Sequence, residues 1–565
     1  MASLQGIAKS ALFVNHVGFL PGGPKHLVMA NPPSPEYIIN ADIWGHAPAF
    51  RGKLVRVSGE LGDAWVGDFS AMQEQGLFEA CCGDLRSHPF PVHGEVYDQP
   101  LRTLFNYYPT QRCGDSRTGW HAPCHLQDAK RTDTGGQLRL AGGWHQSCDL
   151  RKWITGTPYG LLGLSQLGLL KNPRWDEGRI ADELRWGNRY FHNMIRPDGG
   201  LMDSVVVPLG WGERLVYPND PPTCSSYVMI VGQTMAARYL KERDPAHSSA
   251  CLDAAMRIWN YMTGPACPKT RYRPGVLPPG HEWLADCFAA HYPGSAMERG
   301  DALYAALNLA EATGDEKFID QACRLAADLL RLQVQTEDES DPASGCFRIG
   351  PDNDHLIAFG QCTTFGTVFG AMGLAELALL RPEHADAPKW RRAVRLIAEQ
   401  KCWGAARNPW GLVPSYWYSD KPENGRPGGS GRYRYFFRFR SPNGGEIRVG
   451  PNGDITGSAL FMRRAWRLLG DQRYRVVAQR QVDWILGCNP FDSSTVEGVG
   501  LNQPMRYMNG GEFFPPTPQI PGAVMTGIQG DAQDEPEPFA NNCSTEYDIP
   551  SGAPLLWLLS ELSSL

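Results

Sequence analysis

The sequence lacks long apolar runs, a charge excess of one sign and a regular spacing of cysteines. A membrane-spanning helix needs about 20 consecutive apolar residues, and no stretch of the chain approaches this length. The net charge is only −6, with 20% of residues charged. Proteins that bind nucleic acids or anionic membranes usually carry an excess of positive charge, and this chain does not. We therefore expect neither a nucleic acid nor a membrane as partner.

The 15 cysteines are odd in number and irregularly spaced, which argues against a disulfide framework. Residues 1–10 are too short and too polar for a signal peptide. These two features predict a cytoplasmic protein in a reducing compartment. A secreted protein is the alternative if a signal peptide precedes this sequence.

At 565 residues the chain exceeds what one hydrophobic core usually supports, so two domains are expected. Residues 1–96 contain short strand-like runs (10–14, 53–57 and 77–80) separated by turns rich in glycine and proline. This pattern predicts a small all-β, immunoglobulin-like sandwich.

From residue 97 onward the apolar residues recur with helical periodicity. Twelve helices are expected, near 97–109, 151–169, 175–195, 223–242, 247–263, 297–313, 315–335, 361–379, 387–402, 454–469, 471–487 and 548–564. Two junctions share a Gly-Asp pattern, at 314–318 and 470–474, and 243–245 is a weaker copy. Glycine ends one helix in a left-handed conformation and aspartate caps the next. Repeated helix pairs totalling twelve predict an (α/α)6 barrel over 97–565.

The predicted connections at 110–150, 264–296, 403–453 and 488–547 are long, and long connections in compact domains are usually functional. The first holds Cys113, Cys124 and His125, and His145 follows shortly after. Two thiolates and two imidazoles suit a closed, structural zinc site. The spacing is not that of a zinc finger, so two buried thiols with two surface histidines is an equal alternative, and His121 is a competing ligand.

Several motifs, in order, resemble glycoside hydrolase family 9 from about residue 10 to the C-terminus. Gly-Gly-Trp-His-Gln-Ser-Cys-Asp at 142–149 falls on that family's Gly-Gly-Trp-His/Tyr-Asp-Ala-Gly-Asp motif. The other matching segments are 14–21 (Val-Asn-His-Val-Gly-Phe-Leu-Pro), 111–114, 124–129, 483–490 and 545–546 (Thr-Glu). The first of these resembles the opening strand of the immunoglobulin-like domain that precedes many family members.

The resemblance implies inverting hydrolysis of a β-glycosidic bond, with Asp149 as general base and Glu546 as general acid. It also places Cys113, Cys124, His125 and His145 on zinc ligands. Two such carboxyl groups should stand about 6.5–9.5 Å apart to admit a water. Glu546 must carry a raised pKa, from burial or a nearby negative charge, to stay protonated near neutral pH. Calcium is a second cofactor that relatives bind, although the sequence contains no EF-hand loop.

This chain departs from the family pattern at three places. Gln146 replaces the first motif aspartate, Cys148 replaces a glycine, and 503–509 (Gln-Pro-Met-Arg-Tyr-Met-Asn) stands where the family has a Pro-His-His-Arg segment. We therefore expect an atypical member that is not a standard cellulase, with exo-action as one form of the difference. The alternatives are a glycan-binding relative without efficient chemistry, and lyase-like chemistry on the same scaffold.

Aromatic residues are dense between 403 and 440, and sugar faces pack well on aromatic rings. An equal alternative is that most of these rings bury the loop on the barrel. Alternating arginines at 432–440 also suit an acidic sugar. The candidate substrate-binding residues are Trp144, Gln146, Trp410, Trp417, Tyr433, Arg506 and Tyr507.

Overall fold

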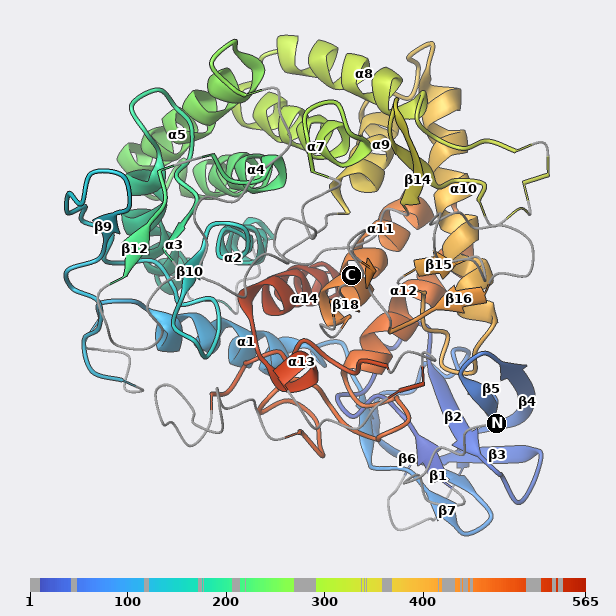
Figure 1. The fold of residues 1–565 in the computed structure, drawn as a ribbon. Helices are drawn as coiled ribbons and strands as arrows, with labels where there is room; N and C mark the ends of the chain where they lie inside the picture. Colours follow the sequence, from blue (N-terminus) through green and yellow to red (C-terminus); the bar gives the residue numbers. More distant parts are fainter. Residues whose placement is uncertain are drawn as a thin grey trace.

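Twelve long helices form a closed double ring in the computed structural model (Figure 1). The structure describes residues 11–41, 48–115, 121–170, 175, 177–205, 214–218, 220–268, 291–336, 338–339, 341, 343–357, 368–414, 416–418, 432–436, 439–440, 446–447, 451–504, 520–530, 535–536 and 542–564. The inner ring contains α2 (Tyr159–Leu169), α4 (Thr223–Leu240), α7 (Ala296–Thr313), α9 (Phe369–Leu380), α11 (Asn452–Leu469) and α14 (Ile549–Ser563). Each inner helix contacts the next, and α14 closes the ring on α2. The (α/α)6 barrel expected from the sequence is confirmed.

The outer ring is built from the helices that alternate with these along the chain. They are α1 (Asp98–Gln111), α3 (Glu177–Phe191), α5 (Pro245–Thr263), α8 (Lys317–Leu330), α10 (Ala387–Ala406) and α12 (Gln472–Ile485). Burial separates the two rings: nearly every residue of α4 is buried. In α8, by contrast, the buried residues recur every three or four positions, as expected for a helix that covers a core with one face.

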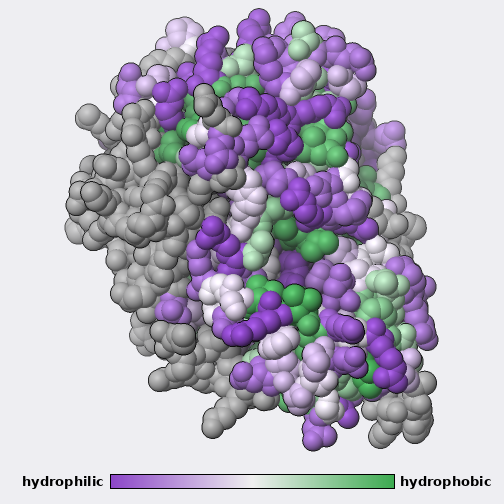
Figure 2. All heavy atoms as spheres, turned by 90° about the vertical axis from the view of Figure 1, so that its right-hand side faces the viewer, coloured by the Kyte–Doolittle hydropathy of each residue, from purple (hydrophilic) through white to green (hydrophobic). Residues whose placement is uncertain are grey.

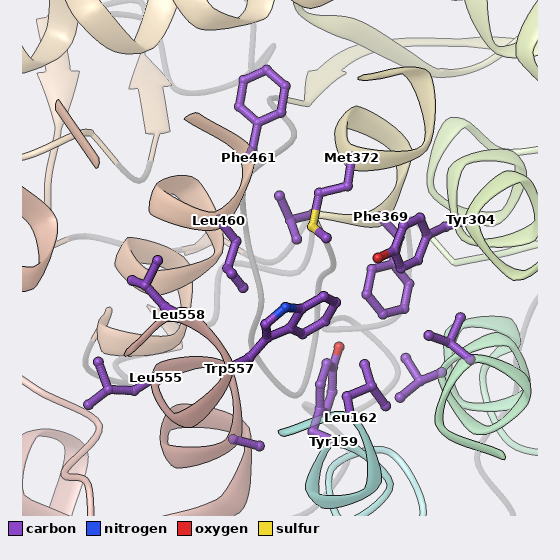
Figure 3. Close-up of a cluster of buried hydrophobic side chains, with 14 of the residues drawn as sticks. Tyr159, Leu162, Tyr304, Phe369, Met372, Leu460, Phe461, Leu555, Trp557 and Leu558 are labelled. Atoms are coloured by element: carbon purple, nitrogen blue, oxygen red, sulfur yellow. The ribbon is translucent and has the colours of Figure 1, made fainter. Parts of the chain in front are cut away.

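The core of the barrel is filled by side chains that converge from several inner helices (Figure 3). Tyr159 and Leu162 come from α2, Phe369 from α9 and Leu460 from α11. Trp557 of α14 lies among them and is 3% exposed. The inner ring is therefore closed across its middle by apolar side chains.

The glycines of both Gly-Asp junctions act as the sequence predicts, but the aspartate of the first junction is not at the N-cap position. In α8 that position is Glu316, with no side-chain cap hydrogen bond. Gly314 and Gly470 end α7 and α11 in the left-handed conformation, with φ of 72° and 79°. Asp471 then accepts a hydrogen bond from the Arg473 N–H and caps α12. At the third junction Asp244 caps α5 in the same manner. These short junctions all join an inner helix to the following outer helix.

The long connections all run from an outer helix to the next inner helix. Consequently they gather at the end of the barrel where the inner helices begin. One expected boundary is wrong: the helix predicted at 151–169 begins only at Tyr159. Residues Lys152–Trp153 instead form a short strand, β10, that pairs with β11 (Ser204–Val205). The residues just before α2 therefore belong to a small sheet at this end of the barrel and not to the helix.

An antiparallel β-domain precedes the barrel. Its strands are β1 (Ala11–Phe13), β2 (His26–Ala30), β3 (Glu36–Asn40), β4 (Pro48–Gly59), β5 (Gly62–Asp68), β6 (Gly76–Cys82), β7 (Leu85–Arg86) and β8 (Phe90–Val92). They pair in the order β1-β2-β5-β4-β3-β6-β7, with β8 on β6. The first half of β4 pairs with β3 and the second half with β5, so this strand joins two parts of the sheet around a separate apolar core.

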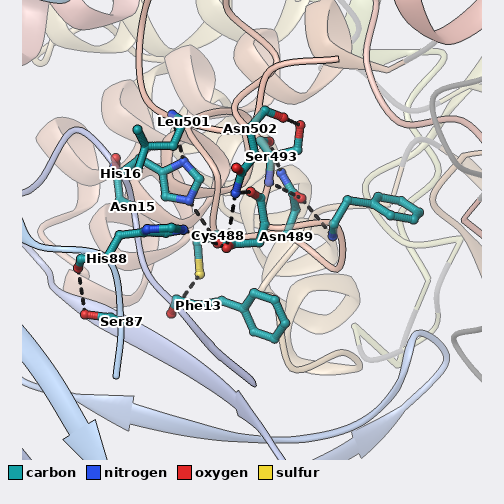
Figure 4. Close-up of polar contacts among 12 residues, drawn as sticks. Phe13, Asn15, His16, Ser87, His88, Cys488, Asn489, Ser493, Leu501 and Asn502 are labelled. Carbon is teal, nitrogen blue, oxygen red and sulfur yellow. Dashed lines mark hydrogen bonds and ion pairs between the residues drawn. The ribbon is translucent and has the colours of Figure 1, made fainter. Parts of the chain in front are cut away.

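Polar contacts fix the β-domain to the segment that follows α12 (Figure 4). Asn15 Nδ2 donates to Asp483 Oδ1 at 2.9 Å. His16 Nε2 and His88 Nε2 lie 2.9 and 2.8 Å from the two carboxylate oxygens of Asp492. The backbone N–H of His16 also donates to the Leu486 carbonyl. The two parts of the chain thus share a specific polar interface.

The described surface is mostly hydrophilic on one face of the molecule (Figure 2). Hydrophilic residues cover most of the described surface on the face drawn in Figure 2, and apolar residues occur there in separate patches. Among the helices that the structure describes, none is long and apolar enough to cross a membrane.

Candidate active site and metal centre

Two loops that are far apart in sequence lie side by side at the open end of the barrel. Ser147 and Asp548 form an antiparallel bridge, and the Ile549 N–H donates to the Gln146 carbonyl at 3.1 Å. The first loop carries Asp149 and the second carries Glu546. The backbone therefore holds the two predicted catalytic carboxyl groups at the N-terminal end of α14.

Asp149 has a partially exposed carboxylate, with 17% of its side chain accessible. Oδ1 accepts the Arg151 backbone N–H at 3.1 Å, and Oδ2 lies 3.5 Å from the Arg151 Nε. The guanidinium compensates the negative charge of the carboxylate. A solvent-accessible, charge-compensated carboxylate is suited to accept a proton from a water molecule.

Glu546 differs from Asp149 in its electrostatic environment. Burial, together with the negative charge of Asp149, raises the pKa of Glu546 to about 8. The role expected from the sequence requires a raised pKa of Glu546, caused by burial or a nearby negative charge. The structure shows both causes. At neutral pH this carboxyl group is protonated and can act as a proton donor.

Ser147 connects the two carboxyl groups. Its Oγ lies 2.8 Å from Glu546 Oε1 and 3.2 Å from Asp149 Oδ1. A hydroxyl has one proton, so it can donate to only one of the two groups. The Ser147 hydroxyl is therefore placed to donate to Glu546 Oε1 or to Asp149 Oδ1, and the contact with Glu546 is the shorter of the two. One hydroxyl group thus links the two carboxyl groups.

The contacts with Ser147 limit the distance between the two carboxyl groups. Because Ser147 Oγ contacts both, the nearest oxygens of Asp149 and Glu546 are at most about 6 Å apart. The separation of the whole carboxyl groups that is typical of inverting enzymes is about 6.5–9.5 Å.

The other two substituted positions of the motif, Gln146 and Cys148, are both buried. Gln146 is 8% exposed, and its Oε1 packs against Gly156, where an added Cβ would lie only 2.1 Å from it. Cys148 is fully buried, and burial raises its pKa well above the usual value. Its thiol therefore stays protonated beside the carboxyl groups.

Two of the predicted substrate-binding rings lie in the core instead. Trp144 is 0% exposed, packs edge-on against Tyr108, and donates its Nε1–H to Glu183. Trp410 is 3% exposed and packs between Phe13 and Trp484. Both rings stabilise loops on the barrel, which corrects their predicted role in substrate binding. For Trp410 this is the alternative that the sequence left open.

The remaining predicted contacts are less completely described. Trp417 and Tyr433 are partners in the antiparallel pairing of β15 (Tyr416–Tyr418) with β16 (Arg432–Arg434), so their backbones lie side by side. Arg506 and Tyr507 lie outside the residues that the structure describes.

The four predicted zinc ligands come together. The ligand atoms of Cys113, Cys124, His125 and His145 all lie within 4.8 Å of one another. Cys113 Sγ is 3.9 Å from His125 Nδ1, and Cys124 Sγ is 3.4 Å from His145 Nε2. In tetrahedral zinc, sulfur and nitrogen ligands are about 3.6 Å apart, from metal–ligand bonds of about 2.3 and 2.1 Å. The four side chains therefore fit a closed zinc site.

A buried charged group supports this cluster from the barrel side. Arg214 is 0% exposed; it donates to Cys113 Sγ at 3.2 Å and forms an ion pair with Asp128. Lys152 Nζ lies 3.3 Å from the same aspartate. Burial raises the pKa of Cys113, but a hydrogen bond from Cys124 and the charges of Lys152 and Arg214 hold it well below the usual value. The environment thus favours a thiolate.

His16, His88 and Asp492 form a second group with metal-binding side chains. Here the Leu501 backbone N–H donates to His16 Nδ1 at 3.2 Å. In a neutral imidazole the proton must then be on Nε2, the atom that faces Asp492. His16 Nε2 is therefore a hydrogen-bond donor, and we interpret this group as an interdomain contact.

The sequence reasoning missed four residues of these sites: Ser147, Arg151, Lys152 and Arg214. One signal for Ser147 was present, since the family motif has alanine at this position. Arg214 carried no signal, because it lies far from the cluster in sequence and outside any motif.

Comparisons with known proteins agree with this geometry. The model of glycosyl hydrolase family 9 matches residues 97–343. The cellodextrinase of Butyrivibrio fibrisolvens is 21% identical over 525 residues, which cover 86% of this chain and 85% of that protein. The chain spans 44% to 53% of the length of four further curated relatives.

Solved structures share the whole fold. A metagenome-derived glycoside hydrolase family 9 endoglucanase has a TM-score of 0.71 at 22% identity and covers 100% of both chains. AaCel9A, solved in complex with cellobiose-like isofagomine, has a TM-score of 0.68 at 20% identity, covering 98% of this chain and 100% of that one. The family model, the curated relatives and the fold therefore agree: residues 97–343 match glycosyl hydrolase family 9, and these similarities support a glycoside hydrolase that acts on β-glycosidic bonds.

Proposed function

We propose that the enzyme hydrolyses its substrate with inversion, using Glu546 as general acid and Asp149 as general base. The observation that carries this proposal is the asymmetry of the pair. One carboxylate is compensated by Arg151, while the pKa of the other is raised to about 8 by burial and the charge of Asp149. Such a pair provides a proton donor and a proton acceptor at one site, as acid/base hydrolysis of a glycosidic bond requires, and inversion is the outcome that the family resemblance implies.

The reaction proceeds in one displacement. Glu546 donates its proton to the oxygen that leaves with one sugar, while Asp149 takes a proton from the attacking water. The resulting hydroxide equivalent bonds to the anomeric carbon from the opposite face. After the step Asp149 is protonated and Glu546 is ionised.

The proposed substrates are short β-linked glucose oligosaccharides, attacked from a chain end. The relative that matches over most of both chains is named a cellodextrinase, and one structural neighbour was solved with a cellobiose-like ligand. The departure of residues 503–509 from the family's Pro-His-His-Arg segment favours a binding mode other than that of a standard cellulase.

The first test is a panel of neutral, amino and acidic β-linked oligosaccharides, with products followed by mass and by proton NMR of the anomeric centre. Asp149→Asn and Glu546→Gln keep the size of each side chain and remove its proton chemistry. We expect α-configured initial product and a loss on the order of 100-fold or more in kcat for each variant. Binding without cleavage, equal in all three proteins, would instead support the glycan-binding alternative. β-configured initial product would refute inversion.

Exo-action requires a separate measurement. An exo-acting enzyme releases reducing ends from carboxymethylcellulose with little fall in viscosity, and cuts cello-oligosaccharides into a single short product. A rapid fall in viscosity at low conversion would identify endo-action and reject this part of the proposal.

We also propose that Cys113, Cys124, His125 and His145 hold one structural zinc ion. The donor set and the tetrahedral spacing of the ligand atoms support it. A bound zinc would fix the loop that leads into the Asp149 motif, since His145 lies four residues before the base. Calcium binding, the immunoglobulin-like classification of the β-domain and a cytoplasmic location stay predictions.

A further inference from the structure

At the end of each turnover, an inverting enzyme has a protonated general base and an ionised general acid, the reverse of the state in which it began. Asp149 has gained a proton from water, and Glu546 has lost one to the leaving group. Before the next turnover, one proton must leave Asp149 and one must reach Glu546. In most sites solvent would carry both transfers.

In this chain a hydroxyl group lies between the two carboxyl groups. Ser147 Oγ is 2.8 Å from Glu546 Oε1 and 3.2 Å from Asp149 Oδ1, both within hydrogen-bond distance. Ser147 itself is 2% exposed. The bridge between Ser147 and Asp548 fixes the backbone on both sides of the contact.

We propose that Ser147 is an internal relay that returns the proton from Asp149 to Glu546 after each turnover. This inference rests on the proposed function. In the transfer the protonated Asp149 gives its proton to Ser147 Oγ, while the Ser147 hydroxyl gives its own proton to the Glu546 carboxylate. One O–H bond forms and one breaks at Ser147, which is unchanged at the end. The net result is the starting state, with Asp149 ionised and Glu546 protonated.

The surroundings favour this direction of transfer. Arg151 donates its backbone N–H to Asp149 Oδ1, and its Nε lies 3.5 Å from Asp149 Oδ2. The negative charges of Asp149 and Asp548 favour the protonated state of Glu546. Asp548 itself caps α14 by accepting the Ser551 N–H at 2.8 Å. The low exposure of Ser147 limits exchange with water along the same path.

The relay is tested by removing the hydroxyl in the full-length enzyme. Ser147→Ala should fold, because the family motif has alanine at this position. Ser147→Thr keeps a hydroxyl on the same carbon. Ser560→Ala is the matched control, since Ser560 is a buried serine of α14 whose Oγ donates to the Leu556 carbonyl of the same helix. Thermal unfolding of all three confirms that they are folded.

The readout separates proton return from bond cleavage. In dilute buffer we expect Ser147→Ala to lower kcat on the order of tenfold while kcat/KM changes less than about twofold, because return follows the first irreversible step. Rising concentrations of imidazole at constant pH should restore kcat, since a small buffer can carry the proton. Wild type, Ser147→Thr and Ser560→Ala should not respond to imidazole.

Two failures can be distinguished. If wild type cleaves its substrate but Ser147→Ala has unchanged kcat, or a loss that imidazole does not restore, the relay is refuted and the proposed function stands. If wild type turns over no β-linked oligosaccharide, the proposed function fails, and the relay falls with it.

Discussion

His16 donates a hydrogen bond from its Nε2 to Asp492 Oδ1 at 2.9 Å, across the interface between the β-domain and the barrel. The tautomer is fixed by the Leu501 N–H at Nδ1, and the His16 side chain is 0% exposed. The donor therefore has no alternative partner in water. The two parts of the chain are coupled by a buried contact whose loss has a defined cost.

Asp492→Ala should lower the free energy of unfolding by about 1–3 kcal/mol, because it leaves the buried His16 N–H without an acceptor. Chemical denaturation followed by fluorescence measures the change. Asp133→Ala is the control, since Asp133 forms an exposed pair with Arg131 and its loss should cost only about 0–1 kcal/mol. Equal effects of the two substitutions would contradict the buried contact.

The pH dependence of activity should reflect Glu546. A general acid works only when protonated, and burial with the charge of Asp149 raises the pKa of Glu546 to about 8. We therefore expect kcat/KM to be retained through neutral pH and to fall as pH rises past about 8. Initial rates at low substrate concentration across pH 5–10 measure this limb. A fall near pH 5 would show that Glu546 is ionised at neutral pH and is not the acid.

Removing zinc should destabilise the enzyme. At a zinc concentration about 1,000-fold above its dissociation constant, binding contributes about 4 kcal/mol to stability. We expect one zinc per chain by elemental analysis, and a lower unfolding temperature after chelation or in Cys113→Ser. Cys323→Ser, at a half-buried thiol of α8, should keep its zinc and change stability by about 0.5 kcal/mol or less. Zinc content unchanged in Cys113→Ser would exclude this site.

Trp410 should matter for stability more than for substrate binding. Trp410→Ala removes a ring that packs between Phe13 and Trp484, at a cost of about 3–5 kcal/mol. Trp410→Phe should cost much less, because among the described residues the buried Nε1–H has no hydrogen-bond partner. Unfolding experiments measure both, and KM should be unchanged in Trp410→Phe. A raised KM with normal stability would restore the substrate-binding role.

Helix pairing could be predicted from the sequence because it is local. The Gly-Asp junctions specify where one helix ends and the next begins, and Phe318 and Tyr474, three residues after each aspartate, are 1% and 2% exposed as expected. The orientation of an aromatic side chain in a long loop depends on tertiary packing, because either face of the loop can pack on the barrel. Neighbouring residues in the sequence do not specify it. Trp144 and Trp410 were therefore misplaced. The zinc ligands could be recognised by residue type, whereas Arg214 beneath them could not.

The bridge between Ser147 and Asp548 also has a consequence during synthesis. Ser147 and Glu546 are 399 residues apart, so the base loop emerges from the ribosome long before its partner. With the proposed roles of Asp149 and Glu546, a nascent chain gains its general acid only when this late segment docks. The proposed mechanism therefore places catalytic competence after the synthesis of Glu546, and a polypeptide released before that point would lack the acid.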